Sequence, residues 1–228
     1  MCGRYALFGP VSTSRAALAE MDRLELNLDG LINAREPQYN IAPTQKALVV
    51  AVGEEGAEMK ALRWGLVPSW AKDEKIGARA INARAESVQD KPMFRAAFKK
   101  RRCLVPASGY FEWRVEAGGK QPYFIRQGDG ELLMFAGLWE AWRPSDAGEW
   151  LRTFAIITGE PGKVSGDIHD RQPVILPPDR WDMWLTGTAQ DGHAALRDLP
   201  NADLAYYAVP KAVGSPRNRG PELVQPLT

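Results

Sequence analysis

The sequence contains few of the side chains that bind metals or form disulfides. Among its 228 residues there are only two cysteines and two histidines. They are Cys2, Cys103, His169 and His193, and no C-x-x-C motif is present. Two cysteines form one disulfide at most, which excludes a secreted scaffold built on several bridges. With so few nitrogen and sulfur ligands, we expect no metal site.

Long apolar runs and a large net charge are also absent. No run approaches the roughly 18 apolar residues of a membrane helix, and the first residues do not form a secretory signal. We therefore expect a cytoplasmic protein with no membrane contact. The net charge is +1, yet residues 61–114 hold 12 Lys or Arg against 5 Asp or Glu, a local charge of +7. This zone suits a phosphate backbone, although a solvated basic helix face has the same composition.

Short apolar segments separated by turns predict more strand than helix. Ser12-Thr13-Ser14 predicts the start of a helix that runs to about Asp22, and residues 90–102 and those from 177 predict two more. Strands are predicted at residues 47–52, 103–107, 109–115, 122–126, 132–142, 154–158 and 174–176. Residues 109–115 alternate, which predicts one face with Phe111, Trp113 and Val115 and an opposite face with Tyr110, Glu112 and Arg114. We expect a single α+β domain over residues 1–228, with a mostly antiparallel, barrel-like β core and flanking helices.

Cys2 is the residue whose position carries most chemical information. Cysteine is small enough for removal of Met1, which would leave an α-amine and a thiol on adjacent carbons. The amine has a pKa of about 7.7–8.0, so part of it is neutral near pH 7 and can attack an aldehyde to form an imine. The thiol can then add to the imine and close a thiazolidine. A small residue at position 2 can equally serve N-terminal processing alone.

Several short motifs, in order along nearly the whole chain, resemble the SOS response-associated peptidase (SRAP) family of abasic-site processing proteins. The motifs are Met1-Cys2-Gly3-Arg4-Tyr5, Tyr39-Asn40-Ile41-Ala42-Pro43, Trp64-Gly65-Leu66-Val67-Pro68-Ser69-Trp70, Ile81-Asn82-Ala83-Arg84-Ala85-Glu86, Gly109-Tyr110-Phe111-Glu112-Trp113, Ile168-His169-Asp170-Arg171, and Val213-Gly214 with Glu222-Leu223-Val224-Gln225-Pro226. Ala71 departs from the family pattern, in which some relatives carry a second aromatic residue after Trp70.

The resemblance implies four catalytic residues. Cys2 is the nucleophile, and Asn82 holds the adduct through its side-chain amide. Glu112 is the acid/base carboxylate, and its pKa should be raised for that role. His169 helps to open the sugar ring or to reverse the crosslink. From the residues alone, Glu112 could instead be a solvent-facing strand carboxylate, Asn82 a turn residue, and His169 a loop histidine paired with Asp170.

The resemblance also implies a DNA-binding surface. Arg4 and Arg84 match positions that clamp phosphates, and Trp70 could stack on a base. Pro43 and Asn40 are predicted to lie against the DNA as well. The expected partner is single-stranded DNA with an abasic site, or a junction with duplex on one side, bound by a monomer without a cofactor. The protein would be associated with the nucleoid when bound.

Three functions fit these expectations. The first is covalent capture of abasic sites through a thiazolidine at Cys2, with weak lyase activity and slow reversal of the crosslink. The second is a thiol autopeptidase that removes Met1, and the third is a non-catalytic reader of modified DNA. An aldehyde-bearing DNA should give a covalent product only for the first.

Overall fold

The computed structural model describes residues 2–9, 13–26, 32, 35–54, 56–145 and 148–227, so Met1 and Ser12 lie outside the described residues. The strands are β1 (Tyr5–Leu7), β2 (Gln38–Ile41), β3 (Lys46–Gly53), β4 (Gly56–Trp64), β5 (Asn82–Arg84), β6 (Arg102–Ala107), β7 (Gly109–Glu116), β8 (Gly119–Gln127), β9 (Leu133–Trp142), β10 (Leu151–Gly159), β11 (Gln172–Pro173) and β12 (Leu204–Ala208). The α-helices are α1 (Arg15–Arg23), α3 (Arg95–Lys100), α4 (Lys163–Gly166), α5 (Trp181–Thr186) and α6 (Ala189–Ala195). Four 3-10 helices are η1 (Glu74–Arg79), η2 (Pro178–Arg180), η3 (Lys211–Gly214) and η4 (Pro221–Val224).

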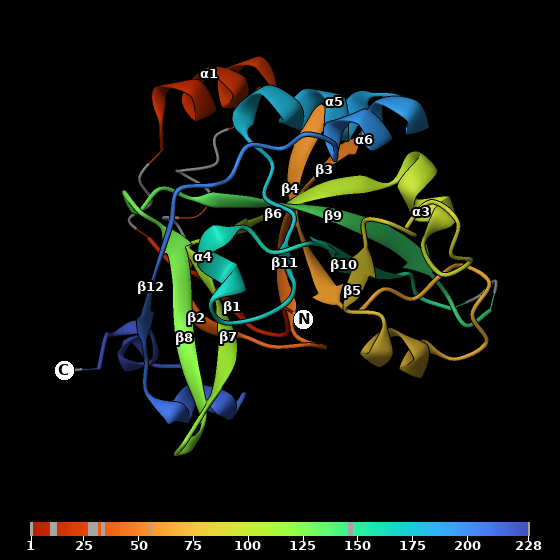
Figure 1. Ribbon diagram of the computed structural model, residues 1–228. Coiled ribbons are helices and arrows are strands. Elements are labelled where there is room, and N and C mark those ends of the chain that lie inside the picture. The colour runs from red at the N-terminus through yellow and green to blue at the C-terminus, as the bar shows by residue number, and fades with distance from the viewer. Residues whose placement is uncertain are drawn as a thin grey trace.

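Five strands close into a barrel. Their order is β10-β4-β3-β6-β9, and β9 pairs again with β10 from Leu151↔Trp142 to Ile156↔Gly137. Most neighbours are antiparallel, but β10 runs parallel to β4 and to β5 (Figure 1). Because a closed sheet has no free edge, each barrel strand satisfies its backbone groups on both sides. The structure thus confirms the α+β fold and the barrel-like core.

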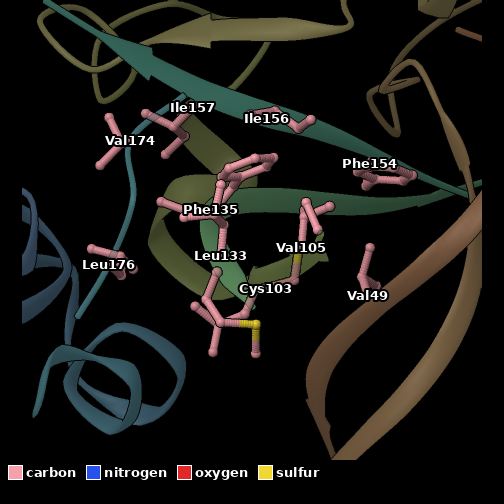
Figure 2. Packing of buried hydrophobic residues seen from close by; sticks show 14 of the residues in the cluster. Val49, Cys103, Val105, Leu133, Phe135, Phe154, Ile156, Ile157, Val174 and Leu176 are labelled. Atoms are coloured by element: carbon pink, nitrogen blue, oxygen red, sulfur yellow. The ribbon is translucent and has the colours of Figure 1, made fainter. Parts of the chain in front are cut away.

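The barrel interior is filled by apolar side chains from all of its walls. Figure 2 shows Cys103 and Val105 of β6 facing Phe135 of β9 and Phe154 and Ile156 of β10. All five are fully buried. The whole of β6 is buried, which is why its sequence is a continuous apolar run rather than an alternating one. Cys103 is therefore a small core residue.

A second sheet, in the order β12-β8-β7-β1-β2, lies beside the barrel. The alternation predicted for β7 is confirmed, because Phe111 joins an outer apolar cluster while Tyr110 belongs to the main core. The outer cluster contains Val213 and Leu223 from the C-terminal segment, which covers that face of the sheet. Glu112 shares the face of Tyr110 and therefore points toward the barrel.

The helices gather mainly at one end, where α1, α5 and α6 lie together above the strands (Figure 1). Ser14 caps α1 as the sequence indicated, its side chain accepting from the backbone N–H of Ala17. The helix predicted over residues 90–102 is too long, since α3 begins only at Arg95. A turn in which Lys91 N–H donates to Ser87 O precedes α3. Pro92 has no backbone N–H, so this hydrogen bonding cannot continue at the next residue.

One arginine of the basic zone over residues 61–114 has a structural role. Arg102 is 4% exposed, and its guanidinium donates to the backbone carbonyls of Trp184, Phe98 and Gly187. It therefore ties β6 to α5 rather than facing solvent. Within the described ranges, no helix is long and apolar enough to cross a membrane.

Candidate active site around Cys2

Cys2 lies between the second sheet and the barrel. Strand β1 begins three residues later and pairs with β7 through Tyr5↔Tyr110, while Phe111 N–H donates to Arg4 O at 2.9 Å. This register brings the start of the chain beside Glu112. The Cys2 side chain is fully buried, and its sulfur lies 4.0 Å from Arg4 O. Burial raises the pKa of the thiol, and the neighbouring Glu112 carboxylate raises it further. Cys2 is therefore a neutral thiol in this state.

Asn82 contacts Cys2 directly. Its Nδ2 donates to the Cys2 carbonyl oxygen at 2.7 Å, a bond that joins residues 80 positions apart. Asn82 is the first residue of β5, which pairs with β10 through Ile156↔Asn82, so the barrel fixes its position. The Oδ1 atom is buried, and it has no hydrogen-bond partner among the residues described. A buried amide oxygen without a partner is costly, so the side chain that bonds Cys2 still has an unused acceptor.

Glu112 is a buried carboxylate with 3% of its surface exposed. Burial raises its pKa from 4.5 to about 7, and the charge of Asp170 adds to the increase. A carboxyl group that titrates near neutrality can both donate and accept a proton at physiological pH. The alternative of a solvent-facing strand carboxylate is therefore excluded by the fold.

A buried hydrogen bond links the strand of Glu112 to the segment that carries His169. Tyr110 OH lies 2.6 Å from Ser165 Oγ, and Ser165 is 1% exposed. The backbone N–H of His169 in turn donates to Ser165 O at 2.9 Å. Burial raises the pKa of the Tyr110 hydroxyl, and the neighbouring Cys2 and Glu112 side chains raise it further, so the hydroxyl lies near both. Sequence reasoning missed this pair, although Tyr110 stands two residues from Glu112 on the same strand face.

His169 has 28% of its side chain exposed, and its Nδ1 lies 2.8 Å from Asp170 Oδ1. The same Nδ1 accepts from Arg171 N–H at 3.1 Å. Both contacts cannot be optimal together, because an ion pair needs a proton on Nδ1 whereas the second bond needs its lone pair. Burial lowers the pKa of His169, which favours the neutral ring with its proton on Nε2.

A small cationic cluster flanks Asn82. Arg84 pairs with Thr158 across β5 and β10, and Arg171 donates to Thr158 O at 2.7 Å. Arg171 also forks onto Glu86 at 2.6 and 3.0 Å. Arg171 and then Arg84 lower the pKa of Glu86, so both guanidinium groups lie near one carboxylate and leave a net positive charge. Arg171 belongs to a motif noted in the sequence, but its place beside Arg84 follows only from the strand pairing.

Arg4 and Asn40 form a tie to the C-terminal segment. Arg4 Nη1 donates to Asn40 Oδ1 at 2.8 Å and to Val213 O at 2.6 Å. Asn40 is 3% exposed, and its amide donates to Ser215 O at 3.0 Å and Asn218 O at 2.8 Å. Asn40 thus has a structural function in this state, while half-buried Arg4 stays beside Cys2. A contact of either residue with DNA remains a prediction.

Trp70 and Pro43 lie on two loops that leave the barrel near Trp64. The loop of Pro43 is held by a bond from Thr44 N–H to Trp64 O at 2.8 Å. Trp70 is 56% exposed, which is unusual for so large an apolar side chain. Its exposure is compatible with the predicted stacking role.

The fold and the site together define the class of protein. It is a small α+β protein in which a thiol, an amide and a carboxyl with a pKa near neutrality lie around residue 2. The family model "SOS response associated peptidase (SRAP)" matches residues 1–216, and the chain belongs to this family. The abasic site processing protein YoqW of Bacillus subtilis is 38% identical over 99% of both chains. YedK of Escherichia coli is 31% identical over 100% of both chains, and chicken HMCES is 32% identical over 100% of this chain and 78% of its own.

The fold is shared with a solved structure. The crystal structure of a protein from Bacteroides thetaiotaomicron superimposes with a TM-score of 0.79 at 26% identity, covering 100% of both chains. The barrel and second sheet that hold Cys2 are therefore a fold found in an experimentally solved protein.

Proposed function

We propose that this protein captures abasic sites in single-stranded DNA covalently, through the amine and thiol of Cys2 after removal of Met1. The observation that carries the proposal is the convergence of Asn82 and the buried carboxyl of Glu112 on Cys2. Membership of the SRAP family and similarity to proteins named for abasic-site processing support the substrate class.

The chemistry needs no co-reactant besides the open-chain aldehyde of the abasic sugar. The neutral α-amine of Cys2 forms an N–C1′ bond while the aldehyde oxygen takes up a proton. That oxygen leaves as water, which gives an imine. The sulfur then forms an S–C1′ bond and the thiol proton moves to the nitrogen. The product is a thiazolidine, and it no longer contains the C=N bond that water would hydrolyse.

Glu112 is placed to move the protons in these steps. With a pKa of about 7 it can protonate the departing oxygen and then accept a proton from nitrogen or sulfur. His169, neutral with its proton on Nε2, can assist the opening of the sugar ring and the slow reversal. Asn82 fixes the Cys2 backbone and, because an amide is not an acid, does not protonate the amine, which must stay neutral to act as a nucleophile.

Access to Cys2 depends on processing. In the unprocessed chain the Cys2 side chain is fully covered and its amine is locked in a peptide bond. The proposal therefore requires that loss of Met1 frees the amine and admits the sugar. A flexible single strand, or a junction with duplex on one side, lets the sugar rotate into such a pocket. Arg84 and Arg171 would hold the flanking phosphates, and Trp70 an adjacent base.

The test is incubation with single-stranded DNA that carries one abasic site, followed by denaturing electrophoresis. The processed wild type should give a stable adduct, as should the matched thiol control Cys103→Ala. Cys2→Ala and a chain with an uncleaved N-terminal extension should give none, and Asn82→Ala and Glu112→Gln should react more slowly. An equal yield from all variants would refute the proposal.

The same assay separates the two competing functions. An autopeptidase that only removes Met1 would release its peptide product but leave abasic DNA unmodified. A non-catalytic reader would bind the DNA equally well with Cys2→Ser and give no adduct. Strand cleavage that depends on Cys2 would identify the weak lyase activity.

A further inference from the structure

A groove lies at the far end of the β9–β10 hairpin, away from Cys2. It has a volume of about 820 Å³, and its walls include Trp139, Trp142 and Trp150. Trp150 is 57% exposed. An indole left in water is costly, and exposed tryptophans of this kind are typical of binding surfaces. None of these tryptophans has a role in the site around Cys2.

The groove adjoins the loop of Trp70. Ser69 lines it, and Ser69 N–H donates to Glu140 Oε2 at 3.2 Å. On the other side of Trp70, Ala71 O accepts from Trp142 Nε1 at 2.7 Å. Both neighbours of Trp70 are thus fastened to β9, which forms the groove wall. The loop of Trp70 therefore borders the groove.

Strand β10 gives the distance between the groove and the catalytic residues. Trp150 stands immediately before β10, and Ile156 of β10 pairs with Asn82. Strands β10 and β5 lie side by side (Figure 1). At about 3.3 Å per residue, the interval from Trp150 to Ile156 spans roughly 20 Å. Stacked nucleotides rise about 3.4 Å per step, so roughly six of them cover this distance.

The charges around Trp150 fit a polyanion. The Arg143 guanidinium carbon lies 4.7 Å from the centre of the Trp150 ring. Arg152 is exposed, and it pairs with Ala141, a residue of the groove wall. Among the residues that line the groove, the buried carboxylate Glu140 forms an ion pair with Arg101. Glu149, which precedes Trp150, is an exposed carboxylate, so Arg143 and Arg152 outnumber it beside the indole. Because half of the indole is exposed despite Arg143, a base can stack on it while the guanidinium groups contact phosphates.

We propose that this groove binds the single-stranded DNA flanking the abasic site, with one base stacked on Trp150 and phosphates near Arg143 and Arg152. The inference rests on the proposed function for its choice of DNA as the ligand. The groove would add a second contact about six nucleotides from the lesion, so that the protein could bind the strand before the covalent step.

Binding of intact DNA tests the groove independently of the chemistry. The affinity of an undamaged, fluorescently labelled 12-nucleotide single strand is measured by anisotropy with chains that all carry Cys2→Ala. Trp150→Ala should weaken binding by about tenfold, because stacking contributes about 1–3 kcal/mol per base. Trp150→Phe should restore most of the affinity. Val115→Ala, which alters another exposed apolar side chain on β7, is the matched control.

Charge gives a second readout. Arg143→Gln should reduce the slope of log affinity against log salt concentration by about 0.7, the value for one phosphate contact on a single strand. If Trp150→Ala binds within twofold of the control, the groove proposal is wrong and a protein ligand becomes the better candidate. If no crosslink forms but Trp150→Ala weakens DNA binding tenfold, the covalent function is refuted and DNA binding by the groove is supported.

Discussion

Replacement of Glu112 by glutamine should stabilise the fold while it slows the reaction. Glu112 is 3% exposed, and burial raises its pKa from 4.5 to about 7. Glutamine has nearly the same shape but cannot ionise. The variant therefore removes the cost of burying a charge, together with the group that moves protons.

The magnitude follows from the linkage between protonation and folding. Below pH 4.5 the carboxyl is protonated in both folded and unfolded chains, so the wild type pays no penalty. As the pH rises from 4.5 to 7, the unfolded chain ionises first and the folded state loses about 1.4 kcal/mol per pH unit. Above pH 7 the loss levels off at about 3 kcal/mol. Glu112→Gln should recover up to this amount.

Urea denaturation of wild type and Glu112→Gln at pH 5 and pH 8 measures this difference. We expect the two proteins to differ by less than about 1 kcal/mol at pH 5 and the variant to be more stable by about 3 kcal/mol at pH 8. Glu54→Gln, an exposed carboxylate after β3, is the control for loss of one charge. A variant that is destabilised equally at both pH values would show that burial does not raise the pKa of Glu112 in the folded protein.

Three further predictions concern other parts of the site. Iodoacetamide should label Cys2 in the processed chain and leave it unlabelled when an N-terminal extension is retained, with Cys103 unlabelled in both, as peptide mapping would show. Ser165→Ala should lower the free energy of unfolding by about 1–3 kcal/mol, because it leaves the buried Tyr110 hydroxyl without its partner. Ser165→Thr should crosslink faster than Ser165→Ala. An unchanged crosslinking rate for Ser165→Ala would argue against the link to His169. Asn40→Ala should lower the free energy of unfolding by about 3 kcal/mol in urea denaturation, because it removes buried hydrogen bonds to the C-terminal segment. A change below about 0.5 kcal/mol, which is typical of surface substitutions, would contradict that role.

The positions of β3 and of β6 to β10 could be predicted from the sequence, whereas β1, β2, β4, β5, β12 and the partners of all strands could not. The strand predicted at residues 174–176 is wrong, because this segment forms only an isolated bridge between Ile175 and Phe135 and the short strand β11 ends before it. Alternation in β7 placed Phe111 and Glu112 on opposite faces, and the structure confirms this. Periodicity says nothing about which strand lies alongside, so it predicts neither the parallel pairing of β10 with β4 and β5 nor the closure of the barrel. That pairing is what brings Asn82 to Cys2.

The environment of each side chain was harder to predict than its chemistry. Arg102 belongs to the basic zone over residues 61–114, yet its guanidinium is buried against backbone carbonyls. Sequence reasoning grouped Asn40 with the DNA-binding residues, and the structure places its amide against the C-terminal segment. In both cases the partners are backbone atoms from residues distant in the sequence, which leave no pattern in the residue types themselves.

Mass spectrometry of the crosslinked peptide is the most direct measurement of the central chemistry. Trypsin should release Cys2-Gly3-Arg4 from the processed protein, and after nuclease digestion this tripeptide should carry the mass of one deoxyribose remnant, with no free amine or thiol left to label. This modification should form without any reducing agent. A remnant found on a lysine, or on Cys2 with its amine still reactive, would contradict it.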